Sequence, residues 1–203
     1  MAVDPHELLQ AVDEARCLDF LAELVRFKSY PDTPGETLLA RFLAQRMQEL
    51  GLQTALQHVE GERYNALGTW RGTGGGKTLL LAGHLDTNPA AEGWTVDPWA
   101  GQIDDRFIYG LGVSNMKAGD AAFFCAVKTL LERGYRPRGH VTLAYVVGEL
   151  QGGIGTLKAI EQGLGGDCFI IGEPTDLQAL TLHAGTFNFV IELVGATRHV
   201  SKR

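Results

Sequence analysis

The segment TLLLAGHLDT, residues 78–87, joins an apolar run to two residues that can take part in a metal site. Residues 79–82 are all apolar, which predicts a strand buried on both faces, as in a sheet covered by helices. His84 and Asp86 follow this run. A carboxylate near a histidine can hold one ring N–H and fix the tautomer, which leaves the other ring nitrogen free to bind a cation.

Two more apolar runs end in carboxylates. The segment HVTLAYVVGE, residues 140–149, ends at Glu149, and DCFIIGEP, residues 167–174, contains Glu173. Both runs predict buried strands. The carboxyl ends of parallel strands meet at one edge of an open α/β sheet, where ligands bind. We therefore expect these two carboxylates to lie near His84.

The segments before and between these runs have helical or strand patterns. Helices are predicted over residues 6–27, 36–51, 116–134 and 152–163, and further strands over 52–59 and 64–72. Alternating strands and helices predict an α/β fold, with a largely parallel mixed sheet flanked by helices. We assign residues 1–185 to this domain.

The last residues have a different pattern. In TFNFVIELVG, residues 186–195, apolar and polar residues alternate, which predicts a strand with one face in water. A single strand does not make a domain, so residues 186–203 are interpreted as the truncated start of a second, α+β unit. In the isolated chain we expect Phe187, Phe189 and Ile191 to expose apolar surface.

The composition excludes several classes of partner. The net charge of −6 argues against nucleic acids and anionic membranes, which require a basic face. No apolar run approaches the length of a membrane span. Three widely separated cysteines, Cys17, Cys125 and Cys168, indicate a reducing compartment and hence a cytoplasmic location. We expect the last two to be buried as small apolar residues.

Four motifs in this order resemble those of a known family: GHLDT at 83–87, YGLGVSNMKAG at 109–119, GELQGG at 148–153 and IIGEPTDL at 170–177. The family is that of the zinc-dependent amidohydrolases and exopeptidases, which includes acetylornithine deacetylase, succinyl-diaminopimelate desuccinylase, aminoacylase and glutamate carboxypeptidase. The resemblance runs from about residue 15 to the end. It implies that residues 1–185 are the N-terminal part of a catalytic domain and 186–203 the start of a lid and dimerisation domain.

The resemblance also implies a role for each matching residue. His84 would bind the first metal, with Asp86 orienting it, and Glu173 would complete the shell of that metal. Glu149 would be the general base, and the context of its strand suggests partial desolvation. His199 resembles the lid histidine that contacts a substrate carbonyl.

Two positions depart from the family pattern. Asn115 stands where an aspartate normally bridges two metals, and Leu150 stands where a glutamate normally binds the second metal. An amide offers one neutral oxygen and leucine offers no ligand atom, so we expect one metal or none. Asp120 could substitute as a ligand, but we expect it either to be solvated or to interact with the dipole at the N-terminus of its helix. We expect Lys117 to be solvated.

Two hypotheses follow. In the first, one divalent metal (zinc, with manganese or cobalt as alternatives) and Glu149 activate water to cleave an amide bond of a small N-acyl amino acid or peptide. The metal would be held by His84, Asn115 and Glu173. In the second, a non-catalytic relative binds a small ligand or a partner in the same pocket. The resemblance implies a homodimer for the full-length form, and we expect the isolated chain to be inactive.

Overall fold

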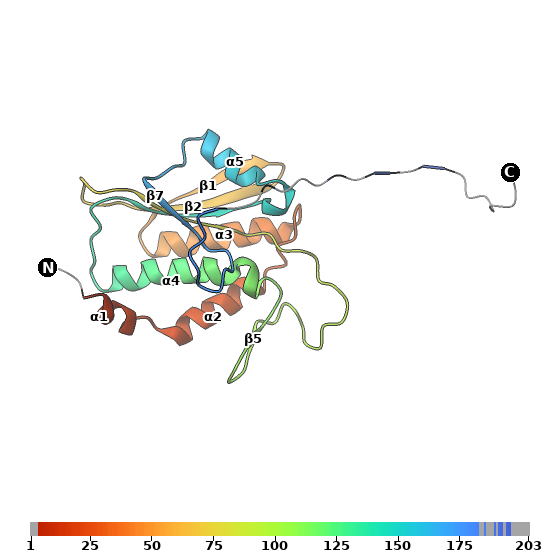
Figure 1. Ribbon diagram of the computed structural model, residues 1–203, viewed down its shortest axis with the longest axis horizontal. Helices are drawn as coiled ribbons and strands as arrows, with labels where there is room; N and C mark the ends of the chain where they lie inside the picture. The colour runs from red at the N-terminus through yellow and green to blue at the C-terminus, as the bar shows by residue number, and fades with distance from the viewer. Residues whose placement is uncertain (1–3, 183–184, 186–188, 190, 193, 196–203) are drawn as a thin grey trace, which may run out of the picture.

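A computed structural model describes residues 4–182, 185, 189, 191, 192, 194 and 195 of the chain. Its centre is a five-stranded sheet with the strand order β1-β2-β6-β3-β7 (Figure 1). The strands are β1 (Gln53–Glu60), β2 (Arg63–Trp70), β3 (Leu79–His84), β6 (Val141–Val146) and β7 (Cys168–Ile171). A separate two-stranded ribbon consists of β4 (Gln102–Ile103) and β5 (Ile108–Tyr109).

The sheet is mixed but mostly unidirectional. Strand β3 pairs in parallel with β6 on one side and with β7 on the other. Strand β2 is antiparallel to both β1 and β6, so only β2 runs against the other four strands. The predicted α/β fold, with a largely parallel mixed sheet flanked by helices, is confirmed.

Helices cover both faces of the sheet (Figure 1). Helices α2 (Glu14–Val25), α3 (Pro34–Glu49) and α4 (Ala118–Glu132) form one layer, in which α3 packs on β1 and β2 while α4 packs on β3 and β6. Helix α5 (Ile154–Glu161) packs on β1 and β2 from the opposite face. Fully buried side chains between the larger layer and the sheet form the core, including Leu24, Leu39, Leu43, Met47, Leu143 and Tyr145.

The N-terminal helix is shorter than its sequence pattern predicts. The expected helix over residues 6–27 is two helices, α1 (Pro5–Gln10) and α2, separated at residues 11–13. The Asp13 side chain accepts a hydrogen bond from the Arg16 N–H and caps α2. An aspartate that satisfies a free N–H of the first turn favours a new helix start over an uninterrupted helix.

Strand β7 contradicts the prediction of a third buried strand. It lies at the sheet edge, and Phe169, Ile170 and Ile171 are 71%, 51% and 56% exposed. Cys168, predicted to be buried, is exposed for the same reason, whereas Cys125 is buried as expected. An apolar strand is buried on both faces only if helices cover it. Helix α4 comes close to Gly172, directly after β7, but the side chains of the strand itself remain exposed.

Half of the expected strand over residues 186–195 lies outside the described residues, including Phe187. Phe189 and Ile191 are described and are 72% and 74% exposed, as predicted. Within the described part of the chain, no helix combines the length and the apolarity needed to cross a bilayer.

Candidate metal centre

Three parallel strands end at one edge of the sheet and deliver polar side chains there. His84 is the last residue of β3, and Asp86 follows two residues later. Glu149 begins a short helical turn, η2 (Glu149–Gln151), shortly after β6, and Glu173 follows β7. Because β3, β6 and β7 run in the same direction, these residues share the carboxyl edge, as the sequence predicts.

His84 is the centre of the group, and it is only 4% exposed. Its Nδ1 lies 2.9 Å from the backbone carbonyl oxygen of Asp86. A carbonyl only accepts hydrogen bonds, so this contact places a proton on Nδ1 and leaves the lone pair of a neutral ring on Nε2. Nε2 lies 2.8 Å from Asn115 Oδ1 and 3.4 Å from Glu173 Oε1.

These three atoms fit a single cation. With the amide oxygen towards His84, all three atoms are hydrogen-bond acceptors, and no proton is available between them in the neutral-ring state. A cation between the three atoms would accept a lone pair from each of them. One imidazole, one carboxylate and one amide oxygen suit zinc, and also manganese or cobalt.

Asp86 acts on this group differently from the expectation. Its carboxylate is 3.7 Å from His84 Nδ1, so the backbone carbonyl, not the side chain, is the close partner of the ring. The carboxylate is fully buried and accepts the backbone N–H groups of Glu149, at 3.2 Å, and Leu150, at 3.0 Å. Asp86 therefore links the histidine to the turn that carries Glu149.

His84, Asp86 and Glu149 also form a potential metal-ligand group, with one atom of each within 4.8 Å of the others. We favour the Nε2 side with Asn115 and Glu173 because the Asp86 carboxylate already accepts two N–H groups. Glu149 is exposed in the described structure, which contradicts the expected partial desolvation. Glu149 is the first residue of η2, and its carboxylate is open to water there.

Asn115 is presented by an irregular helical turn, η1 (Val113–Lys117), whose φ/ψ values at Asn115 (−124°, 106°) are not helical. The turn follows Gly112, which has a φ of +84°. A Cβ atom at Gly112 would lie 2.7 Å from Thr87 Cγ2, so both the backbone conformation and the packing require glycine. The small residues before Asn115 thus allow the chain to pass close to the loop after β3.

Lys117 and Asp120 are both buried. This contradicts the prediction that Lys117 is solvated; for Asp120, which lies in the first turn of α4, it excludes the solvated alternative and leaves the one at the helix N-terminus. Lys117 Nζ donates to the carbonyl oxygens of Leu24, at 3.0 Å, and Phe27, at 2.9 Å, and so fastens η1 to the end of α2. Burial lowers the pKa of Lys117 to about 7, although nearby Asp120 opposes this shift. The burial of Lys117 and Asp120 could not be predicted from the sequence, because the atoms around them come from segments distant in sequence.

A pocket of about 220 Å³ opens over this group. Its lining residues are His84, Asp86, Thr87, Asn88, Gly110, Leu111, Gly112, Ser114, Asn115 and Leu150. Sequence reasoning did not single out Thr87 or Asn88, although each is close in sequence to a residue that it did. His199 lies outside the described residues.

The sequence profile of the peptidase family M20/M25/M40 matches residues 80–199, which include His84, Asn115, Glu149 and Glu173. This chain belongs to the M20/M25/M40 peptidase family. The matched region is more than half of the chain.

Individual relatives agree with this assignment. Succinyl-diaminopimelate desuccinylase of Rhodospirillum centenum is 36% identical over 139 residues, which are 62% of this chain and 36% of that protein. Acetylornithine deacetylase of Edwardsiella ictaluri is 35% identical over 173 residues, which are 84% of this chain and 44% of that protein. The chain therefore spans less than half the length of these curated relatives.

Solved structures share the fold. The M20 family metallo-carboxypeptidase Sso-CP2 from Sulfolobus solfataricus matches with a TM-score of 0.68 and 26% identity, over 77% of this chain and 37% of that protein. A tripeptidase from Staphylococcus aureus matches with a TM-score of 0.65 and 26% identity, over 79% of this chain and 43% of that protein.

Proposed function

We propose that this chain is the metal-binding half of a hydrolase that cleaves an amide bond of a small N-acyl amino acid or peptide-like substrate. The observation that carries the proposal is the meeting of His84 Nε2, Asn115 Oδ1 and Glu173 Oε1 at the sheet edge where Glu149 also lies. The names of the relatives, a desuccinylase, a deacetylase and a carboxypeptidase, support the substrate class.

In this proposal His84, Asn115 and Glu173 hold one divalent cation, zinc in the first instance. Such a cation, when bound, supplies Lewis-acid polarisation of a carbonyl group and makes a nearby water more acidic. Asp86 keeps the His84 ring oriented through its carbonyl oxygen and holds the Glu149 turn through its carboxylate. The Glu149 carboxylate takes a proton from the attacking water and passes it to the leaving amine.

The proposed centre is mononuclear. Two divalent cations a few ångströms apart repel each other, and carboxylate ligands offset that repulsion. Asn115 supplies a neutral oxygen at one of the positions concerned, and Leu150, which lines the pocket, supplies none at the other. The remaining carboxylates fit one cation.

A non-catalytic relative is the second candidate, and Leu150 favours it. Its side chain lies in the pocket wall and is 40% exposed, so it presents apolar surface where a charged ligand would otherwise face the centre. In that case the pocket binds a small ligand without hydrolysing it.

Metal content per chain and hydrolysis are the first measurements, made on the longest natural form of the polypeptide that contains this chain. We expect about one metal ion per chain by elemental analysis and metal-dependent hydrolysis of a panel of N-acyl amino acids. Glu149→Gln should keep the metal and lose on the order of 10²-fold or more in kcat, because the amide cannot accept the proton. Equal hydrolysis by the wild type and Glu149→Gln would contradict the proposed mechanism.

Restoring the two absent carboxylates tests the mononuclear part of the proposal. Asn115→Asp combined with Leu150→Glu should raise the metal content towards two ions per chain. A wild-type ratio near zero would favour the non-catalytic candidate.

The remaining parts of the proposal concern the whole protein. We propose a lid and dimerisation domain from residue 186, His199 as a contact for the substrate, and a homodimer for the full-length form, all on the strength of the family resemblance. A cytoplasmic location is supported by Cys17, Cys125 and Cys168, which are all free thiols. The net charge of −6 supports a small-molecule partner over a nucleic acid.

A further inference from the structure

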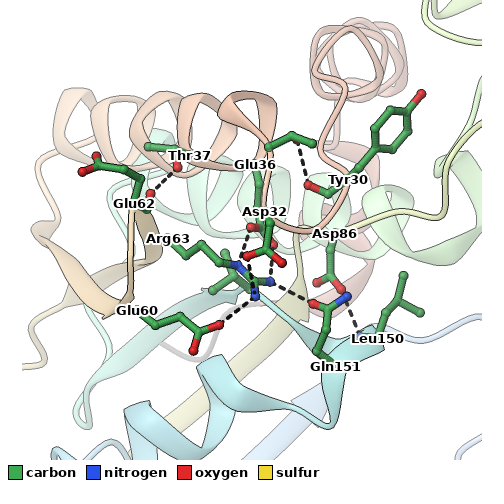
Figure 2. Close-up of polar contacts among 12 residues, drawn as sticks. Tyr30, Asp32, Glu36, Thr37, Glu60, Glu62, Arg63, Asp86, Leu150 and Gln151 are labelled. Carbon is green, nitrogen blue, oxygen red and sulfur yellow. Dashed lines mark hydrogen bonds and ion pairs between the residues drawn. The ribbon is translucent and has the colours of Figure 1, made fainter. Parts of the chain in front are cut away.

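Arg63, at the start of β2, is buried at the junction of α3 and the turn that carries Glu149 (Figure 2). Its side chain is 5% exposed, and its guanidinium contacts several acceptors. Nε and Nη2 donate to the two carboxylate oxygens of Glu36, at 2.7 and 2.9 Å, in a bidentate pair. Nη1 donates to Glu60 at 3.2 Å and forms an ion pair with Asp32 at 3.4 Å.

The guanidinium also contacts η2, the turn that Glu149 begins. Nη2 donates to Gln151 Oε1 at 2.9 Å, and Gln151 is the last residue of the turn that Glu149 begins. The same Nη2 would be 3.1 Å from a Cβ atom at Gly148, so it packs directly against the start of the turn. Figure 2 shows Gln151 between Arg63 and the backbone near Leu150 that contacts Asp86.

The rest of the turn is held by two other side chains. Asn65, two residues beyond Arg63 on β2, accepts from the Val147 N–H at 3.0 Å and donates to the Gly155 carbonyl at 2.8 Å. The Asp86 carboxylate accepts the N–H groups of Glu149 and Leu150. Asn65 thus fixes the two flanks of the turn and Asp86 its first residues. The last residue, Gln151, donates its backbone N–H to the Gly148 carbonyl within the turn, and its side chain is held by Arg63.

Stability alone is a weak explanation for the buried Arg63–Glu36 pair. Removing two charges from water costs free energy that their attraction often fails to recover. Burial raises the pKa of Glu36, and the hydrogen bonds and charge of Arg63 oppose this shift. The pair does fix the orientation of the Arg63 side chain. A bidentate carboxylate holds the plane of the guanidinium, so that Nη2 points at the turn.

We propose that Arg63 is a positioning residue for Glu149, aimed by Glu36 and acting through its hydrogen bond to Gln151. This inference rests on the proposed function, in which Glu149 is the general base. A base must lie within hydrogen-bond reach of the water it deprotonates, and an exposed three-residue turn does not maintain such a position without support.

Gln151 allows a test that leaves the buried ion pair intact. Gln151→Met has a similar length but no strong acceptor, so the contact to Arg63 is lost. Gln151→Glu keeps an acceptor and should keep the contact. Glu60→Gln is the matched control, because Glu60 also contacts Arg63, is 59% exposed at its side chain and does not touch the turn.

The first readout is amide hydrogen exchange in the metal-free chain. In Gln151→Met the amides of residues 149–153 should exchange about tenfold faster or more, as expected for losing a hydrogen bond to a charged donor. In Gln151→Glu and Glu60→Gln these amides should exchange as in the wild type. Unchanged protection in Gln151→Met would overturn the proposal.

The second readout is hydrolysis by the longest natural form. Gln151→Met should lower kcat by on the order of 10- to 100-fold with a smaller change in KM. Gln151→Glu should keep the kcat of the wild type. The Tm of both variants should equal that of the wild type. Arg63→Lys should lower both kcat and Tm, because lysine cannot make the bidentate contact with the Glu36 carboxylate. A kcat that Gln151→Met leaves unchanged would overturn the proposal. Absence of hydrolysis in the wild type would instead contradict the proposed function. In that case the amide exchange measurement by itself would show whether Arg63 holds the turn.

Discussion

Asp120 shows how one residue beneath the candidate site affects stability. Its carboxyl group is fully buried, and neither oxygen has a hydrogen-bond partner within the described residues. Burial raises its pKa well above the usual value of 3.8, Lys117 opposes the shift, and Glu173 and Asp86 add to it. The folded protein therefore holds a proton here at pH values where the unfolded chain has lost it.

This difference gives a pH dependence with a definite sign. Because the folded pKa is raised, the contribution of Asp120 to stability is fully present below about pH 4 and is lost as pH rises towards the folded pKa. Asp120→Asn removes this titration. The free energy of unfolding of the variant, minus that of the wild type, should therefore increase from pH 4 to pH 8, by at most about 1.4 kcal/mol per pH unit.

Urea unfolding of the metal-free chain over this pH range, with chelator present, measures the difference. Asp105→Asn is the control, because it makes the same change at an exposed carboxyl. Parallel pH curves for Asp120→Asn and the wild type would show that Asp120 is ionised in the folded state, contrary to this prediction.

At the scale of elements, apolar runs and their polar ends were the most informative part of the sequence. They predicted β3 and β6, and they placed His84, Glu149 and Glu173 at one edge. They could not predict the exposure of β7, because burial of an edge strand depends on which helices cover it. The contacts of Arg63 and Lys117 were equally inaccessible, since their partners Glu36 and Leu24 lie many residues away.

The turn η1 depends on Gly112, and this dependence can be tested. Gly112→Ala forces an L side chain into a backbone with φ of +84° and brings its Cβ to 2.7 Å from Thr87 Cγ2. The first effect costs about 1–2 kcal/mol. The second should shift the turn and move the Asn115 oxygen away from His84 Nε2.

We therefore expect Gly112→Ala to weaken cation binding by about tenfold or more, measured by titration calorimetry with zinc, as well as to lower Tm. Gly134→Ala is a matched control, because Gly134 has a φ of +71° but no atom within 4 Å of the added Cβ. It should lower Tm and leave zinc affinity unchanged. Equal zinc affinities for the two variants would show that η1 does not position a ligand.

At the scale of the whole molecule, the sheet is covered unevenly. Helices α3 and α5 cover the sheet at β1 and β2, and α4 covers β3 and β6. Strand β7 lies at the opposite edge from β1 (Figure 1), and its four residues are exposed. Its outer edge also presents backbone N–H and C=O groups that no described strand pairs. An apolar edge strand with free hydrogen-bonding groups favours association with another chain.

The isolated chain should therefore self-associate through β7. Phe169→Lys combined with Ile171→Lys places two charges on one face of this strand, which should keep the chain monomeric in sedimentation velocity runs at concentrations where the wild type forms larger species. Leu9→Lys is the control, because Leu9 is 70% exposed but lies on α1 (Pro5–Gln10), away from the sheet. A wild-type chain 1–203 that stays monomeric would mean that the twist or the loops beside β7 already protect the edge.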